Sequence, residues 1–425
     1  MRIRGWLLLY RMVTWMVLLT ILCLLPLIKW FNPKFAKWFS LRFWSEPLNF
    51  TPKLWVHAVS MGEIKIALSL LDTQRHKDEA FPADVLLTTS TQSGYRFLTE
   101  RVGKASVRYL PWDVKFAYRR LFGHLNPPNL VVVETEIWPT LFDMVTASGS
   151  KLVIVNGRLG SKTTRLSTNT LFRKTISKVT RIAARSTMDR DRYLQFGIPI
   201  DRVTITGNIK YDFKPKPLAE NSLSQWLAHP QPLMVFASVS TDEISALAPQ
   251  AELLLDSNPE IRILWAPRHL RDLEHHAAAF AGYEPVLRSE ITSTIPRLLI
   301  LDTFGELAAC YGFADLSLIG GSFNQRGGQN FLESLQAGTP AVMGPYTENF
   351  KREVAEALEA ETILCLENPN QVAETLESLL GDAPSLKAMS ERARDYLARH
   401  TGAITRTVDV LVDLNIFEKR VPEDL

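Results

Sequence analysis

Short apolar runs alternate with helix-forming stretches from residue 54 almost to the end of the chain. The runs are rich in Val, Ile and Leu and show little polar alternation, which is typical of strands buried on both faces of a parallel sheet. Helical stretches such as 64–74 and 138–147 separate them, so the pattern predicts successive βα units. The expected strands of a first series are 54–59, 85–89, 107–110, 130–133, 152–155, 182–184 and 203–206. Those of a second series are 233–237, 261–266, 298–301, 316–319, 341–343 and 363–366.

The chain is too long for one ordinary hydrophobic core, because it has 425 residues. A stretch rich in proline and charge separates the two series of strands and is typical of a linker. We therefore expect an α/β protein with two Rossmann-like, doubly wound domains that face a cleft, and ligands at the carboxyl ends of the strands. The expected divisions are an anchor at 1–45, a first domain at 46–209, a linker at 210–222 and a second domain at 223–425.

The N-terminal segment predicts a membrane anchor. Residues 12–28 carry no charge and are mostly apolar, and a helix over 6–30 would be roughly 37 Å long, enough to cross a bilayer. A cleaved signal peptide is the alternative, but no small-residue cleavage site follows the apolar run. We expect a single-pass anchor followed by a segment at 31–44 that lies along the membrane surface.

Charge distribution and cysteine content argue against a nucleic-acid-binding protein and against a disulfide-bonded one. Residues 1–42 hold seven basic side chains and no acidic one, which leaves a net charge of −4 for the rest of the chain. The basic excess thus belongs to the membrane segment, and no nucleic-acid partner is expected. Cys23, Cys310 and Cys365 are far apart and lack metal-ligand spacing, which fits a reducing compartment.

Carboxylates follow two expected strands of the first series. Glu63 stands on the first turn of a helix, where Ser60-x-x-Glu63 is also a capping box, and a general base is the functional alternative. Glu134 and Glu136 follow three valines; they could only satisfy a helix dipole, yet Glu134 should lie nearer the strand end. Lys210 could place a positive charge at the end of this domain or be an ordinary surface lysine.

The second series ends in residues suited to an anionic ligand. Arg268 closes one expected strand, and its guanidinium suits a phosphate. Glycines at 320, 321, 327 and 328 follow another strand and precede Asn330-x-x-Glu333. Such a turn lets the backbone approach an anion at a helix N-terminus, although Asn330 and Glu333 could form a capping box that only closes the helix. Thr303-x-x-Glu306 is another capping-box pattern at a strand end.

A basic run lies between Asp143 and Asp189, with nine Lys or Arg residues and no acid. A solvated helix face is the usual meaning of such a run. In a membrane-tethered chain we expect part of it to bind acceptor phosphates or anionic lipid headgroups. The patch we single out is Arg173, Lys174 and Lys178.

A series of motifs covering nearly the whole chain resembles one family of enzymes. The motifs are, in order, HAVSMGE, TTSTQSGY, LPWD, ETEIWP, NGR, GNIKYD, PRH, DTFGELAACYGFAD, GGSF, GGQNFLE and AGTPAVMGP. As a set they resemble the 3-deoxy-D-manno-octulosonic acid (Kdo) transferases of lipopolysaccharide synthesis. The resemblance implies a GT-B glycosyltransferase of the Gram-negative inner membrane, on the cytoplasmic side. It would move Kdo from CMP-Kdo to a lipid A precursor (lipid IVA), with inversion and without a metal or other cofactor.

The resemblance also implies roles for residues at matching positions. Glu63 would be the general base, and Glu134 and Lys210 would support the transition state; Glu134 is preferred to Glu136 by its position. CMP contacts would be Pro267, Arg268, Phe304, Gly305, Glu306, Asn330, Phe331, Leu332 and Glu333. Helix N-termini after Gly305 and Gly328 would help to stabilise the leaving CMP. Where many relatives read GGHN, this chain has Gln329.

Two other classes remain open at this point. A nucleotide-sugar epimerase could share the two-domain fold, and a membrane-tethered scaffold could retain it without activity. Asp189-Arg-Asp191 resembles the aspartate pair of metal-using transferases, but we interpret it as a surface turn and expect no metal site.

Overall fold

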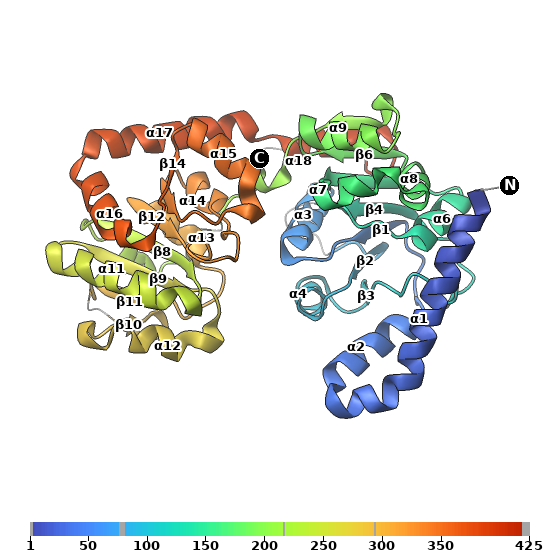
Figure 1. Cartoon of the computed structure of the whole chain (residues 1–425), viewed down its shortest axis with the longest axis horizontal. Coiled ribbons are helices and arrows are strands. Elements are labelled where there is room, and N and C mark those ends of the chain that lie inside the picture. Colours follow the sequence, from blue (N-terminus) through green and yellow to red (C-terminus); the bar gives the residue numbers. More distant parts are fainter. Residues whose placement is uncertain (1–2, 76–80, 216, 293–294, 419–425) are drawn as a thin grey trace. The chain divides into compact units, whose positions relative to one another are not determined.

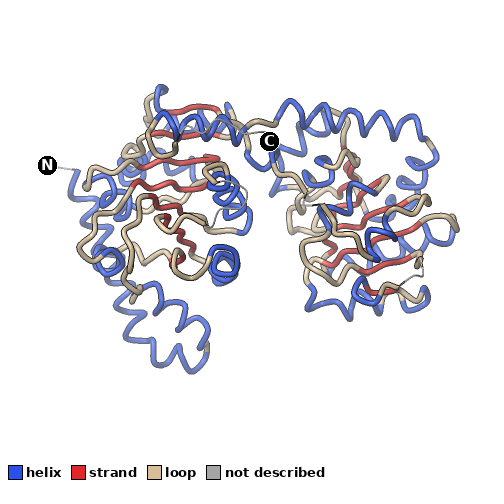
Figure 2. Tube along the Cα trace, turned by 180° about the vertical axis from the view of Figure 1, so that it is seen from behind, coloured by secondary structure: helices blue, strands red, loops and turns tan. Residues whose placement is uncertain are grey.

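Two separate parallel sheets form the framework of the computed structural model, which describes residues 3–75, 81–215, 217–292 and 295–418 (Figure 1). The first unit consists of the chain up to Asp212 together with the segment from Thr401 onward. The second unit is Phe213–His400. Figure 2 shows the strands of each unit lying between helices, as expected of doubly wound α/β folds.

The first unit contains all seven strands of the first expected series. They are β1 (Leu54–His57), β2 (Val85–Thr89), β3 (Val107–Tyr109), β4 (Asn129–Val133), β5 (Leu152–Gly157), β6 (Arg181–Ala184) and β7 (Val203–Ile205). Their order is β3-β2-β1-β4-β5-β6-β7, and every pair is parallel. The direction of the strand order therefore reverses between β1 and β4, which are direct neighbours.

Helices connect these strands and bury their apolar faces against the sheet. They are α3 (Met61–Asp72), α4 (Gln92–Val102), α5 (Lys115–Phe122), α6 (Pro139–Ala147), α7 (Ser161–Thr164), α8 (Thr170–Ile176) and α9 (Thr187–Gln195). The core includes Trp55 of β1 and Phe142 of α6, both fully buried. Burial of this kind is the main favourable term in folding.

The second unit has a sheet of the same kind. Its strands are β8 (Leu233–Val239), β9 (Arg262–Pro267), β10 (Val286–Leu287), β11 (Leu298–Ile300), β12 (Leu316–Ile319), β13 (Ala341–Met343) and β14 (Ile363–Cys365). Their order is β10-β11-β9-β8-β12-β13-β14, again parallel, with the reversal between β8 and β12. The sequence pattern missed β10, because two half-buried residues give no apolar run.

The helices of the second unit vary widely in length. They are α10 (Ser222–Leu227), α11 (Ile244–Ser257), α12 (Leu273–Ala278), α13 (Leu307–Cys310), α14 (Leu332–Gln336), α15 (Lys351–Glu359), α16 (Val372–Gly381) and α17 (Ala383–His400). The two that follow the glycine-rich turns, α13 and α14, have only four and five residues. The longest, α17, has eighteen.

The end of the chain departs from the expected second domain, 223–425. Helix α18 (Ala403–Asp413) belongs to the first unit. The carboxylate of Asp212 accepts hydrogen bonds from the N–H groups of Gly402 and Ile404, at 2.7 and 2.6 Å, and so caps the start of α18. Arg406 adds a hydrogen bond to the Thr206 carbonyl at 2.8 Å. Residues 210–212 thus belong to the first unit, residue 216 of the expected linker lies outside the described residues, and so do 419–425.

The N-terminal segment forms two helices that pack on the first unit. Helix α1 (Ile3–Phe31) is followed by α2 (Pro33–Phe43). Of the described helices, α1 alone is long and apolar enough to cross a membrane, over Gly5–Phe31. Leu18 at its centre is buried in a cluster that contains Phe39 of α2 and Ala117 of α5. One face of the predicted anchor is therefore covered by protein.

Candidate functional site

The carboxyl edge of each sheet has a switch point, where two neighbouring strands lead to connections on opposite sides. In doubly wound sheets this position forms the ligand crevice. Because His57 of β1 pairs with Val132 of β4, the residues that follow these two strands leave the first sheet side by side. Ala237 of β8 and Ile319 of β12 are paired in the same way in the second sheet.

Glu63 lies at the first of these switch points. Ser60 is the N-cap of α3, and its hydroxyl accepts from the Glu63 N–H at 3.2 Å. The Glu63 carboxylate accepts from the Val59 N–H and from the Ser60 hydroxyl, both at 2.8 Å. The capping interaction expected of this motif is thus present. It also holds the carboxylate at the β1/β4 switch point, so the structural and the functional interpretations do not exclude each other.

Glu134 and Lys210 form an ion pair beside Glu63. The Lys210 ammonium donates to the Glu134 carboxylate at 2.9 Å, and the Lys210 chain passes Gly62, whose Cβ position is 3.6 Å from Lys210 Cε. Glu134 has a φ of +58°, a left-handed conformation that is strained for a residue other than glycine and that is often found at functional sites. Three residues singled out by the sequence therefore lie together.

The carboxylates of this site differ in their electrostatics. Burial opposes ionisation of Glu134, but the charge and hydrogen bond of Lys210, then the charges of Arg185 and Arg158, outweigh it and lower its pKa. Burial raises the pKa of Glu63, and the charge of Glu134 raises it further, while the hydrogen bond from Val59 opposes them. Burial and then the charge of Glu63 raise the pKa of Glu136 to about 7. Both Glu134 and Glu136 thus interact with Glu63.

Arg158 and Arg185 also lie at this site, although in the sequence they stood out only as members of the basic run. Each follows a strand of the first sheet, β5 or β6, at the same edge as Glu134. Arg158 and Arg185 directly follow strands, as Glu134 does, so the position that marked Glu134 in the sequence also marks them. Their positive charges stabilise the ionised form of Glu134, which is largely buried.

The second switch point is organised by a buried carboxylate, Glu243, that the sequence analysis did not select. It is 1% exposed and accepts from the N–H groups of Ser240, Gly321 and Phe323 at 3.0, 2.7 and 3.0 Å. Two N–H groups of the glycine-rich turn therefore already bind an anion supplied by the chain. Gly320 is needed here, because its Cβ position lies 2.7 Å from the Ser238 carbonyl oxygen.

The loop after β11 is held at both ends by a short segment at 288–289, which no sequence motif marked. Ser289 donates through its N–H, at 2.9 Å, and its hydroxyl to Asp302. Arg288 makes a bidentate ion pair with Glu306, at 3.0 and 3.2 Å. Glu306, expected to contact CMP, is thus bound to its own chain, whereas Phe304 between these anchors is 82% exposed. The loop presents Phe304 and Gly305, whose φ is +88°.

The remaining residues expected to contact the donor differ in exposure. Arg268 is exposed after β9, and its charge interacts with that of half-buried Glu333. Phe331 and Leu332 are buried, so their side chains belong to the core. The Asn330 side chain accepts from the Leu332 N–H at 3.3 Å.

The helices after Gly305 and Gly328 are too short for the dipole effect that the sequence analysis expected. With four and five residues, α13 and α14 have hardly more than one turn each, whereas the helix dipole arises from many aligned peptides. The N-cap of α14 is Phe331, and its side chain makes no capping hydrogen bond. Any stabilisation of a negatively charged ligand at this edge of the second sheet would therefore come mainly from side chains such as Arg268.

Comparison with known proteins identifies the family. Residues 36–213 match the family model described as 3-deoxy-D-manno-octulosonic-acid transferase (kdotransferase). The 3-deoxy-D-manno-octulosonic acid transferase of Bordetella pertussis is 31% identical over 86% of this chain and 88% of its own length. The chain belongs to the Kdo transferase family. The Haemophilus influenzae transferase is 28% identical over 84% of this chain and 86% of its own length.

Solved structures agree on the fold of this Kdo transferase family member. A glycosyltransferase from Rickettsia africae matches with a TM-score of 0.55 at 10% identity, covering 86% of this chain and 99% of its own. The UDP-GlcNAc 2-epimerase from Neisseria meningitidis matches with a TM-score of 0.51 at 13% identity, covering 85% and 99%. At such identities the likeness shows the GT-B fold alone. Family membership makes the chain a glycosyltransferase and sets aside the epimerase interpretation.

The patch expected to bind the acceptor of the Kdo transferase lies beside α1. Helix α8 carries Arg173 and Lys174 and packs near α1 and α6. Lys178, the third residue of the patch, donates to Asp143 at 2.9 Å, and Asp143 also binds Arg11 of α1 at 2.6 Å. Lys178 therefore helps to attach α1 and differs in this respect from Arg173, which is exposed.

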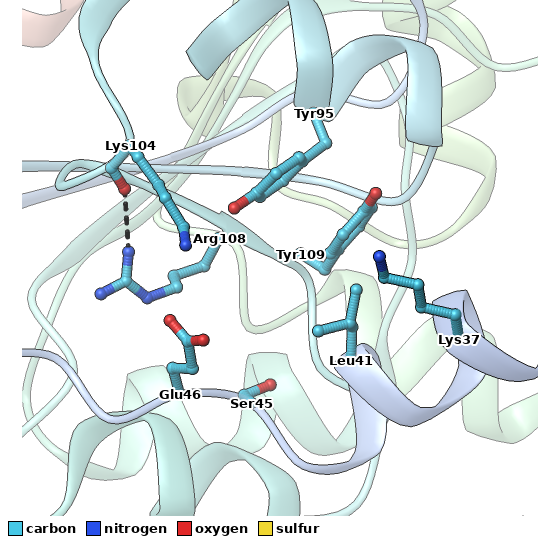
Figure 3. Close-up of a pocket in the computed structure, with 8 residues that line it drawn as sticks. All are labelled: Lys37, Leu41, Ser45, Glu46, Tyr95, Lys104, Arg108 and Tyr109. Carbon is cyan, nitrogen blue, oxygen red and sulfur yellow. Dashed lines mark hydrogen bonds between the residues drawn. The ribbon is translucent and has the colours of Figure 1, made fainter.

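A separate basic pocket of about 240 Å³ lies between α2, α4 and β3 (Figure 3). Lys37, Lys104 and Arg108 supply its positive charge, and Glu46 adds one negative charge. Tyr95 and Tyr109 stack on each other with ring centroids 4.3 Å apart. The Kdo transferase thus has cations on the α2 side of its first unit as well as on α8.

The described residues include no group of three or more His, Cys, Asp or Glu side chains that could hold a metal ion. The aspartate pair was expected to form a surface turn. Asp189 and Asp191 instead belong to α9. Asp189 is 2% exposed and accepts from the Leu159 N–H at 3.1 Å and the Ser186 hydroxyl at 2.8 Å. Ser186 is the N-cap of α9, and the Asp189 carboxylate fixes Ser186 and the loop at Leu159.

Proposed function

We propose that this Kdo transferase moves Kdo from CMP-Kdo to a lipid A precursor such as lipid IVA, by one inverting displacement that needs no metal ion. The observation that carries the proposal is the convergence of Glu63, Glu134 and Lys210 at the β1/β4 switch point. The family gives the sugar that is transferred. The first unit would bind the acceptor, and the second would bind the donor.

Glu63 acts as the general base. It takes the proton of the acceptor hydroxyl while that oxygen forms a bond to the anomeric carbon of Kdo and the bond to the CMP phosphate breaks. A carboxylate with a raised pKa is a stronger base than an ordinary one. The Lys210 ammonium, held by Glu134, stabilises negative charge near the reacting groups.

The donor is held by side chains of the second unit. Arg268 binds the phosphate of CMP and stabilises the charge that it gains on leaving. Glu333 accepts from the ribose hydroxyls, and exposed Phe304 covers the base. Pro267, Gly305, Glu306 and Asn330 shape this site, together with the backbone of Phe331 and Leu332.

The protein works at the inner membrane with both units on the cytoplasmic side. Helix α1 supports the membrane attachment, since it is apolar over Gly5–Phe31. Three free cysteines support a reducing compartment. The acceptor is a membrane lipid, so attachment would keep the enzyme beside its substrate.

Incubation of the purified full chain with CMP-Kdo and a tetraacyl lipid A precursor tests the function directly. Mass spectrometry should show the lipid heavier by one or more Kdo units, together with released CMP. An unchanged lipid with an isomerised donor would indicate an epimerase, and no change in either substrate would indicate a scaffold. The first of these results is required by the proposal.

A further inference from the structure

One face of α1 is partly covered along its length, chiefly by α2 and also by α6 and α8. The covered or half-covered positions recur every three or four residues, as expected of a helix packed lengthwise on a surface. They are Leu7, Tyr10, Arg11, Thr14, Trp15, Leu18, Ile21, Leu22, Leu25 and Ile28. A helix that crosses a bilayer by itself needs no such stripe.

Polar contacts fix the N-terminal half of α1 against the soluble part of the unit. The Tyr10 hydroxyl donates to Asp113 at 2.9 Å, and Arg11 donates to Asp143 at 2.6 Å. Asp113 is itself buried and also accepts from the N–H groups of Thr140 and Leu141, at 2.9 and 2.8 Å. These contacts join α1 to the start of α6, so its position belongs to the fold of the unit.

This packing is incompatible with a perpendicular crossing. Leu18, at the middle of α1, lies against α5, and α5 exposes Lys115, Arg119 and Arg120. If α1 crossed the bilayer while packed in this way, these cations would lie near the centre of the hydrocarbon, where charged side chains are costly. Helix α1 would have to detach from its unit before it could span.

The uncovered face of α1 is apolar apart from Thr20 and Lys29. Leu9, Met12 and Met16 are exposed in its N-terminal half, and Trp30 and Phe31 at its C-terminal end are 81% and 78% exposed. A perpendicular insertion of the α1–α2 tip alone would leave the N-terminal half in water. With α1 parallel to the membrane plane, a single apolar layer covers all of these residues.

We propose that α1 lies in one leaflet of the membrane, parallel to its plane, and does not cross it. The occupant of its outer face is the hydrocarbon of that leaflet. Lys29, Lys34 and Lys37, beside the α1–α2 tip, meet anionic headgroups, and Lys37 also lines the basic pocket (Figure 3). This inference rests on the proposed membrane attachment and replaces the single crossing expected from the sequence.

Protease protection tests the topology of the full chain. Epitope tags with protease sites are added at both chain ends, and the protein is produced in a Gram-negative host. We expect both tags to be protected in intact spheroplasts and both to be cut after lysis, because both ends lie on one side. Cleavage of the N-terminal tag alone in intact spheroplasts would overturn the one-leaflet arrangement while leaving membrane attachment intact. Loss of the chain from washed membranes would instead refute the attachment, and the inference with it.

A matched pair of substitutions tests whether α1 is packed on the unit. Leu18 is 3% exposed and its neighbour Leu19 is 51% exposed. In the detergent-purified full chain, Leu18→Ala should lower the unfolding temperature by about 5 °C or more, and Leu19→Ala should leave it nearly unchanged. Equal effects of the two substitutions would show that α1 has no packed face, and would contradict the proposal.

Discussion

Three neighbouring carboxylates differ in their affinity for protons because their surroundings differ. Glu134 lies among Lys210, Arg158 and Arg185 and stays ionised. For Glu63 and Glu136, burial outweighs the groups that favour ionisation, such as Arg42 beside Glu136, and raises the pKa of each. A site that contains both a stable anion and a carboxylate that takes up protons more readily is suited to proton transfer.

Replacing Glu63 by Gln removes the proposed base while preserving its size. We expect Glu63→Gln to lower kcat by about 10²–10⁴-fold, the usual contribution of a general base. Steady-state rates with CMP-Kdo and a lipid A precursor measure the loss. Glu100→Gln on α4, whose side chain is well exposed, is the control and should keep the original rate. Equal activity of both variants would remove Glu63 from the mechanism.

Glu136 should make stability depend on pH near neutrality. Its pKa in the folded protein is about 7 against an ordinary value of 4.5, so the folded state binds the proton more tightly. The stability that this carboxyl contributes is present below about pH 4.5 and is lost as the pH rises through 7, at most about 3 kcal/mol. Unfolding by urea at pH 5 and pH 8 should show Glu136→Gln gaining on the original protein at the higher pH. A constant difference between the two proteins would contradict the assignment.

Elements were easier to predict from sequence than the contacts that hold them. Thirteen of the strands could be predicted because continuous apolar runs mark strands buried on both faces. Strand ends made Glu63, Glu134 and Lys210 candidates, and the resemblance to the Kdo transferases selected them. The contacts of Glu243 could not, since its partners Gly321 and Phe323 are about eighty residues away and meet it only through the β8–β12 pairing.

Glu243 should stabilise the second unit through the glycine-rich turn. Glu243→Ala leaves three backbone N–H groups without their acceptor, and buried donors without partners cost about 1–3 kcal/mol each. We expect a loss of about 3 kcal/mol or more in the free energy of unfolding, measured with denaturant, and weaker CMP binding. The adjacent Asp242→Ala is the control: Asp242 is half exposed in a surface pair with Arg326, so its loss should cost about 0.5 kcal/mol or less. Similar losses for the two variants would show that Glu243 has no special role.

At the scale of the whole molecule, the chain returns to its first unit after the second is complete. The sequence pattern ended the second domain at the chain end, because α18 follows α17 after only two residues, with no linker-like stretch between them. Its attachment depends on Asp212, Gly402 and Arg406, which no local pattern connects. The position of α1 could not be predicted either, since an apolar helix of about 43 Å is long enough to span or to lie flat.

Metal removal tests the proposed source of charge stabilisation. If Arg268 and Lys210 stabilise the charges of transfer, activity should not depend on divalent ions. The rate with saturating EDTA should stay within about twofold of the rate with added Mg²⁺, since no metal bridges the phosphate in this mechanism. If EDTA abolished activity and Mg²⁺ or Mn²⁺ restored it, a metal ion would stabilise the charges of transfer, and the proposed role of Arg268 and Lys210 would be wrong.

Substitutions in the two units should change the KM of different substrates. Arg268 lies in the second unit and should act on the donor, so Arg268→Ala should raise the KM for CMP-Kdo by about 10-fold or more while sparing the KM for the lipid. Reversal of Arg173 and Lys174 to Glu on α8 should do the opposite, because a like charge would repel the acceptor phosphates beside α1. Calorimetry with CMP provides a second measurement: binding should be weakened by the first change and unaffected by the second. If the α8 variant lost CMP binding alone, the acceptor would have to be assigned to another surface, for which the basic pocket of Lys37, Lys104 and Arg108 is the next candidate.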